Sequence, residues 1–148
     1  MHSDFKELFA LFDKHRVRYL IVGGYAVMLY TEPRYTKDID VVVGMAPEES
    51  DRAVDALEEF GFPMSPDQRL RFKAPNSMVV LGNPPHRIDI LNSVSGLSFD
   101  EAFERRNVVT VDEGQIPFIS LEDLISAKVA AGRPQDRLDL KKLRRLRK

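Results

Sequence analysis

The chain has 148 residues, of which 43% are hydrophobic and 30% are charged, and these values are typical of one globular domain. It contains no cysteine, which excludes disulfides, thiolate zinc sites, iron–sulfur clusters and cysteine nucleophiles. No apolar run reaches the roughly 18 residues of a membrane span, and the first residues do not resemble a signal peptide. We therefore expect a cytoplasmic protein that makes no membrane contact.

The net charge of −1 conceals a basic C-terminal segment. Residues 137–148 hold seven basic residues and one acidic residue, whereas the rest of the chain holds 15 basic and 22 acidic residues. A helix over this segment would dock through Leu138, Leu140, Leu143 and Leu146 and leave the arginines outward. In one interpretation, this segment is a solvated helix face or a frayed terminus. In the other, its positive charge binds the phosphates of RNA or the acidic surface of a partner.

The first half of the chain alternates between helical and extended patterns. Apolar residues at helical spacing follow Ser3, and short apolar or β-branched runs predict strands. Pro47 suits the first turn of a helix, and Gly61 suits the end of one. The expected elements are helices over 3–16, 25–30 and 47–60 and strands over 19–22 and 38–43.

The second half is less regular, above all over residues 62–83. In that stretch, the pattern predicts a hairpin whose strands cover 69–74 and 77–81. Further on, Ser120 and Asp123 fit a helix capping box. The remaining expected elements are strands over 87–91, 108–111 and 116–119 and helices over 99–106, 120–131 and from 134 onward.

This order of elements predicts the fold class. We expect an α/β or α+β fold in which one domain, residues 1–148, has a mixed sheet flanked by helices. The core of this domain would cover about residues 17–119, and two C-terminal helices would cover about residues 120–148.

Two carboxylates interrupt the strand expected over 38–43. Side chains alternate along a strand, so Asp38 and Asp40 share one face while Ile39 and Val41 share the other. Adjacent carboxylates in apolar surroundings repel each other unless a cation or a shared proton neutralises them. Mg²⁺ takes such oxygen ligands together with nucleotide phosphates. The pair therefore either lies at an exposed strand end or forms part of a metal–nucleotide site.

Gly23, Gly24 and Asp89 add to this pattern. The two glycines stand between a strand and a helix, where backbone N–H groups bind phosphate, although a tight turn alone also explains them. No P-loop and no dinucleotide-binding glycine motif is present. Asp89 interrupts another β-branched strand, either as an edge-strand charge or as a third carboxylate beside the first two. Three carboxylates suffice to hold two metal ions.

Together these motifs resemble the polymerase-β-like nucleotidyltransferase superfamily. The glycines at 23–24 and the DID sequence at 38–40 are similar to its glycine pair followed by D-x-D on a strand. RYTKDID at 34–40 resembles the form found in AbiEii-type and related small nucleotidyltransferases, and Asp89 matches the third aspartate of the superfamily. KVAAGRPQDRLDL at 128–140 resembles a K-x(n)-R-x-x-D-x-x-D-L segment of the same branch.

The resemblance implies an activity and a set of site residues. The activity is transfer of a nucleoside monophosphate from an NTP to a hydroxyl, with release of pyrophosphate. Asp38, Asp40 and Asp89 would be catalytic and would ligate two Mg²⁺ ions, with Mn²⁺ as an alternative, and Asp89 would deprotonate the hydroxyl. The implied nucleotide-binding residues are Gly23, Gly24, Arg34, Thr36, Lys128 and Asp136.

The resemblance also implies the partners. The acceptor would be an RNA 3′ end, such as that of tRNA, or a protein side chain, in a toxin–antitoxin setting with a cognate antitoxin or a homodimer. Two alternatives remain: a catalytically silent module of the same fold that binds a nucleotide or a partner, and a different Mg²⁺-dependent phosphotransferase or hydrolase. Convergence of Asp38, Asp40 and Asp89 on one point is the feature that the enzyme hypothesis requires.

Overall fold

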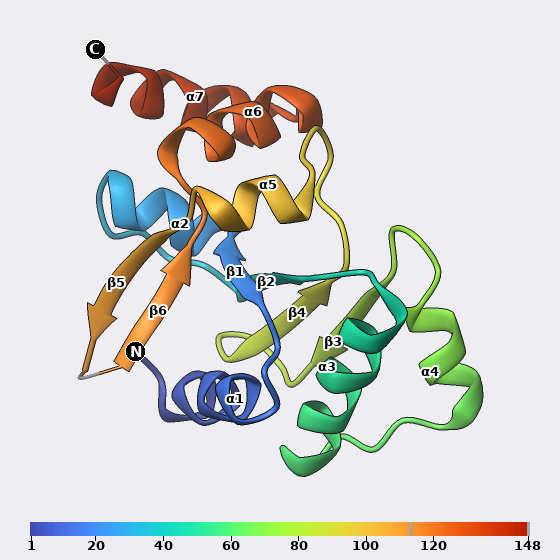
Figure 1. The fold of residues 1–148 in the computed structure, drawn as a ribbon. Coiled ribbons are helices and arrows are strands. Elements are labelled where there is room, and N and C mark those ends of the chain that lie inside the picture. The colour runs from blue at the N-terminus through green and yellow to red at the C-terminus, as the bar shows by residue number, and fades with distance from the viewer. Residues whose placement is uncertain (113, 148) are drawn as a thin grey trace.

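One six-stranded sheet flanked by helices organises the protein (Figure 1), and the computed structural model describes residues 1–112 and 114–147. The strands are β1 (Tyr19–Val22), β2 (Asp38–Val43), β3 (Met78–Leu81), β4 (Arg87–Leu91), β5 (Asn107–Val111) and β6 (Gly114–Phe118). The helices are α1 (Ser3–Lys14), α2 (Gly23–Tyr30), α3 (Pro47–Glu59), α4 (Pro66–Phe72), α5 (Phe99–Glu104), α6 (Leu121–Ala131) and α7 (Pro134–Leu146).

The sheet is mixed, which confirms the expected α/β class. Its strand order is β3-β4-β2-β1-β6-β5. The pairs β1–β2, β3–β4 and β5–β6 are antiparallel, whereas β2–β4 and β1–β6 are parallel. Strands β2 and β4 therefore lie side by side although β3 comes between them in the chain.

One predicted element is wrong. Residues 69–74 do not form a strand, because α4 covers Pro66–Phe72. Its N-terminus is a capping box in which Gln68 N donates to Ser65 Oγ (3.2 Å) and Ser65 N donates to Gln68 Oε1 (2.8 Å). Pro66 occupies the first turn, where its missing N–H costs nothing, and Phe72 is buried. These local contacts outweigh the weak strand pattern.

Helices α1 and α3 pack together on one face of the sheet. Tyr19 of β1 stacks on Phe9 of α1, with ring centroids 5.1 Å apart. Tyr19 is paired with Val43, and Ile21 with Val41, so these four side chains share that face and are buried. The alternate residues of β2, including both aspartates, consequently belong to the opposite face.

The C-terminal helices α6 and α7 pack on each other and against α2 (Figure 1). The packed stripe of α7 consists of Asp136, Asp139, Leu140 and Leu143, which follow the i, i+3, i+4, i+7 spacing. The expectation that four leucines dock together is therefore half wrong, because Leu138 and Leu146 are exposed. Across the described residues, no helix combines the length and the apolar character that a membrane span requires.

Candidate active site

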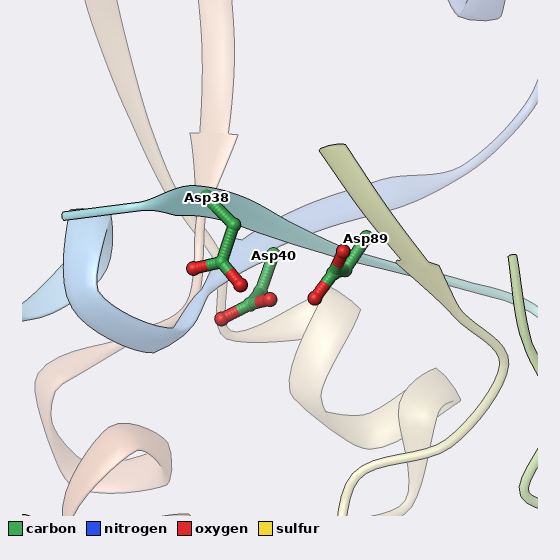
Figure 2. Close-up of side chains that lie close together, drawn as sticks. All are labelled: Asp38, Asp40 and Asp89. Atoms are coloured by element: carbon green, nitrogen blue, oxygen red, sulfur yellow. The ribbon is translucent and has the colours of Figure 1, made fainter. Parts of the chain in front are cut away.

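Asp38, Asp40 and Asp89 come together on the face of the sheet opposite α1. Asp40 of β2 is the register partner of Asp89 on β4, and Asp38 lies two residues earlier on the same face. Each aspartate offers a carboxylate oxygen that lies within 4.8 Å of the other two (Figure 2). Among the residues that the structure describes, no other group of three acidic or histidine side chains has this spacing.

The negative charges of the three carboxylates repel one another. Burial is the largest cause that raises the pKa of Asp40 to about 7, and the negative charges of Asp38 and Asp89 contribute to the same rise. Burial also raises the pKa of Asp38, with Asp89 as the next cause. The site therefore holds more negative charge than its neighbours compensate.

Arg87 provides the nearest positive charge. Its Nε and Nη2 donate to the two carboxylate oxygens of Asp89, at 2.8 and 3.1 Å, and its Nε lies 4.0 Å from Asp38 Oδ2. Arg87 is not among the site residues predicted from the sequence. Arg87 precedes Asp89 by two positions on a strand, so the two-residue side-chain period places both on one face. This alternation in the sequence indicates that Arg87 lies beside Asp89.

The glycine turn closes around Asp40. Gly23 has φ +66°, and a Cβ built there would lie 2.2 Å from Asp40 Oδ2. A Cβ on Gly24 would lie 2.9 Å from Cγ2 of Thr36. Helix α2 begins at Gly23, and the preceding Val22 provides no side-chain cap for its first amides. Amides at a helix N-terminus favour anions, so this turn has the chemistry of a phosphate site.

Lys128 of α6 is buried between two carboxylates and is not exposed on the helix surface. Its Nζ lies 3.1 Å from both Asp136 Oδ1 and Asp139 Oδ2. Arg133 also binds Asp136, and Arg34 also binds Asp139. Burial alone would raise the pKa of Asp136. The hydrogen bonds from Arg133 and Lys128 outweigh this effect and lower the pKa to about 2.

A cavity of about 530 Å³ joins most of these groups. Its lining includes six of the residues singled out in the sequence, namely Gly23, Asp38, Asp40, Asp89, Lys128 and Asp136. Arg87 and Arg133 also line it and add positive charge. Gly24, Arg34 and Thr36 are not among its lining residues. Thr36 and Arg34 instead lie against Gly24, and Arg34 reaches Asp139.

A family model described as "Nucleotidyltransferase of unknown function (DUF6036)" matches residues 2–145. The chain belongs to this family. The assignment confirms the nucleotidyltransferase resemblance, while the AbiEii-type branch stays a prediction. No curated protein matches the sequence.

Solved nucleotidyltransferases share the fold. The lincosamide antibiotic adenylyltransferase LnuA, bound to lincomycin, is 17% identical, with a TM-score of 0.56 over 97% of this chain and 96% of that chain. A Thermotoga maritima protein described as a nucleotidyltransferase is 16% identical, with a TM-score of 0.63 over 97% and 91%. ANT(2″)-Ia, in complex with adenylyl-2″-tobramycin, is 14% identical, with a TM-score of 0.57 over 94% and 84%.

The aspartate cluster fits the metal that this nucleotidyltransferase family implies. The donor set consists of carboxylate oxygens alone, which suits a hard cation such as Mg²⁺. The oxygens converge from two paired strands, and the raised pKa of Asp40 reflects first its burial and then the neighbouring negative charge, which a cation would neutralise. Asp38, Asp40 and Asp89 are accordingly the candidate metal ligands.

Proposed function

We propose that the protein is a Mg²⁺-dependent nucleotidyltransferase that moves a nucleoside monophosphate from an NTP to a hydroxyl acceptor and releases pyrophosphate. The observation that carries the proposal is the convergence of Asp38, Asp40 and Asp89 beside a glycine turn at a helix N-terminus. Metal bound by the aspartates would neutralise phosphate charge as the reaction proceeds.

The bonding changes follow from the reaction class. The acceptor oxygen forms a bond to the α-phosphorus, and the bond from that phosphorus to the oxygen bridging the α- and β-phosphates breaks. The proton of the acceptor hydroxyl passes to Asp89, whose oxygens retain lone pairs while they accept from Arg87. Pyrophosphate leaves with the electron pair of the broken bond.

The remaining polar groups of the cavity have roles in holding the nucleotide. The amides that follow Gly23 would bind the phosphates, and Gly23 leaves the space that Asp40 occupies. Lys128 and Arg133 line the same cavity and bring positive charge toward the polyphosphate. The two aspartates that bind Lys128 hold its ammonium group in place.

The wider setting rests on resemblance. An RNA or protein acceptor and a toxin–antitoxin pair follow from the AbiEii-type motif. LnuA and ANT(2″)-Ia, by contrast, were solved with lincomycin and with adenylyl-2″-tobramycin. Those ligands support a nucleotide partner and extend the range of acceptors to small molecules.

The direct test is Asp40→Asn, with the exposed Asp67→Asn as its matched control. The substitution removes a carboxylate from the candidate metal site, so we expect Mg²⁺-dependent nucleotide affinity to fall by on the order of tenfold or more. Calorimetric titration with an NTP analogue carrying a methylene bridge between the α- and β-phosphates measures this without turnover. Asp67→Asn should bind like the wild type.

Transfer is measured with ³²P-labelled NTPs, total tRNA and small hydroxyl compounds as acceptors. Asp40→Asn should lower labelling by on the order of a hundredfold. A wild-type protein that binds the analogue without Mg²⁺ would contradict the proposed metal role. Mg²⁺-dependent binding with no labelled product from any acceptor would favour the silent nucleotide-binding module.

A further inference from the structure

A second cavity lies beside the candidate active site. Its volume is about 430 Å³, within the range of small-molecule sites. Leu20 and Val22 of β1 and Val42 of β2 line it, opposite α5 and the segment that precedes this helix. The partly exposed Met45 also lines it.

The two cavities adjoin each other. Val22, Ser93 and Val94 line both of them. Val22 is the register partner of Asp40, and the next pair on the same face is Leu20 with Val42. Two residues along a strand span roughly 7 Å, so the floor of the second cavity begins about one side-chain pair away from Asp40.

The lining of the second cavity is unsuited to a polyanion. Among the described residues that line it, none is basic, and the two ionisable ones are Glu49 and Asp100. Arg18 binds both carboxylates, at 2.7 Å each, so the three groups together carry a charge of −1. RNA binding depends on Lys and Arg contacts to phosphates, which this lining does not offer.

The other polar groups of the lining are mostly engaged. The Asn92 amide binds Ser77 N and the carbonyl oxygens of Phe72 and Ala74. Ser98 caps α5. Ser93 donates to Asn76 Oδ1 at 2.7 Å and keeps acceptor lone pairs at the junction of the cavities. A ligand hydroxyl can therefore form a hydrogen bond with Ser93 at the junction of the two cavities, and an apolar group fits the remainder of the second cavity.

We propose that this second cavity binds the acceptor, and that the acceptor is a small hydroxyl compound with an apolar body and a neutral or positive charge. The inference rests on the proposed function and names the substrate class of the same site. The body of the acceptor fills the space between Val42 and Leu97. Its hydroxyl points past Ser93 toward Asp89.

Binding is tested without nucleotide by using three probes that share a 4-hydroxyphenyl ring. They are tyramine, 2-(4-hydroxyphenyl)ethanol and 4-hydroxyphenylacetate, which are cationic, neutral and anionic. We expect the first two to shift the methyl NMR signals of Val42, Val94 and Leu97 and the third to leave them unchanged. Equal shifts from the anion, or no shift from any probe, would overturn the proposal.

Leu97→Trp fills the cavity from the segment before α5 and should abolish these shifts. Leu70→Trp is the matched control, because Leu70 is exposed on α4 and lines neither cavity. Met45→Trp narrows the cavity from a partly exposed position and serves if Leu97→Trp does not fold. Asp100→Asn, at an exposed side chain, should reduce the preference for the cation by about two- to fivefold.

Labelled transfer then links the cavity to the reaction. Transfer to 2-(4-hydroxyphenyl)ethanol that falls at least tenfold in Leu97→Trp, and not in Leu70→Trp, would support the acceptor role. Efficient labelling of total tRNA by the wild type that is unchanged in Leu97→Trp would overturn it. Shifts of the same methyl signals by the NTP analogue alone would also overturn it, because the nucleotide would then occupy the cavity. Probe binding without Mg²⁺-dependent nucleotide binding would contradict the proposed function instead.

Discussion

At the scale of single residues, Gly23 and Asp40 depend on each other. The positive φ of Gly23 turns the chain from β1 into α2, and its missing side chain leaves room for the Asp40 carboxylate. Gly132 has nearly the same φ, +64°, but a Cβ there would meet its nearest atom at an ordinary 3.8 Å. A comparison of alanine substitutions at Gly23 and Gly132 therefore distinguishes the cost of the left-handed backbone from the cost of a steric clash with Asp40.

We expect Gly132→Ala to lower the free energy of unfolding by about 1–2 kcal/mol, the cost of the left-handed conformation. Gly23→Ala should cost more, because the added methyl group also displaces Asp40. It should weaken Mn²⁺ binding at least tenfold, whereas Gly132→Ala should leave the metal affinity unchanged. Urea unfolding and metal titration measure the two effects. Equal metal affinity in both variants would show that Gly23 does not position Asp40.

At the scale of elements, buried ion pairs join α6 and α7. Asp136 and Asp139 of α7 are almost fully buried and bind Lys128 of α6. Breaking one partner of such a group leaves an uncompensated charge in the interior. The exposed ion pair between Glu122 of α6 and Arg147, which directly follows α7, offers a comparison at the surface.

Asp136→Asn should lower the free energy of unfolding by about 3 kcal/mol at pH 6, whereas Glu122→Gln should change it by less than about 1 kcal/mol. The folded-state pKa of Asp136 lies near 2, below the unfolded value of 3.8. Its contribution is therefore present above pH 4 and is lost as the pH falls toward 2. Denaturant titrations at pH 6 and pH 3 should show a smaller difference between wild type and Asp136→Asn at pH 3. A difference that grows at pH 3 would contradict this assignment.

At the scale of the whole molecule, one hydrophobic core includes residues from α1 through α7. Phe5 and Phe12 at one end of the chain and Leu140 and Leu143 at the other belong to the same buried cluster. The basic α7 also forms ion pairs with the acidic remainder of the chain, since Lys142 binds Glu32 at 2.9 Å. Part of the charge separation seen in the sequence is thus compensated within the protein.

We predict that residues 1–148 unfold as one domain, because the buried side chains of the described residues form one hydrophobic cluster. Thermal unfolding followed by far-UV circular dichroism and by the near-UV signal of the tyrosines should give coincident transitions. Separate transitions for the two signals would instead indicate that α6 and α7 form a second unit.

Most of the secondary structure was predictable, because its signals are local. The alternation in residues 38–43 placed both aspartates on one face, and Ser120 marked the start of α6. The strand prediction for residues 69–74 is wrong, and the sequence carries the contrary signal, because Ser65 and Gln68 have the spacing of a helix capping box. Local sequence signals are therefore sufficient to predict α4 when Ser65 is included.

Local patterns are enough to identify the candidate site residues, which are three aspartates on strands, a glycine turn, and a lysine with aspartates near the C-terminus. Tertiary structure decided their partners. The parallel pairing of β2 with β4 places Asp89 opposite Asp40, and packing of α6 on α7 buries Lys128 between carboxylates. The tertiary structure also forms an apolar cavity next to the aspartates, and this cavity is lined by residues of β1, β2 and the segment before α5. These features depend on contacts between residues far apart in the chain, and local periodicity carries no information about such contacts.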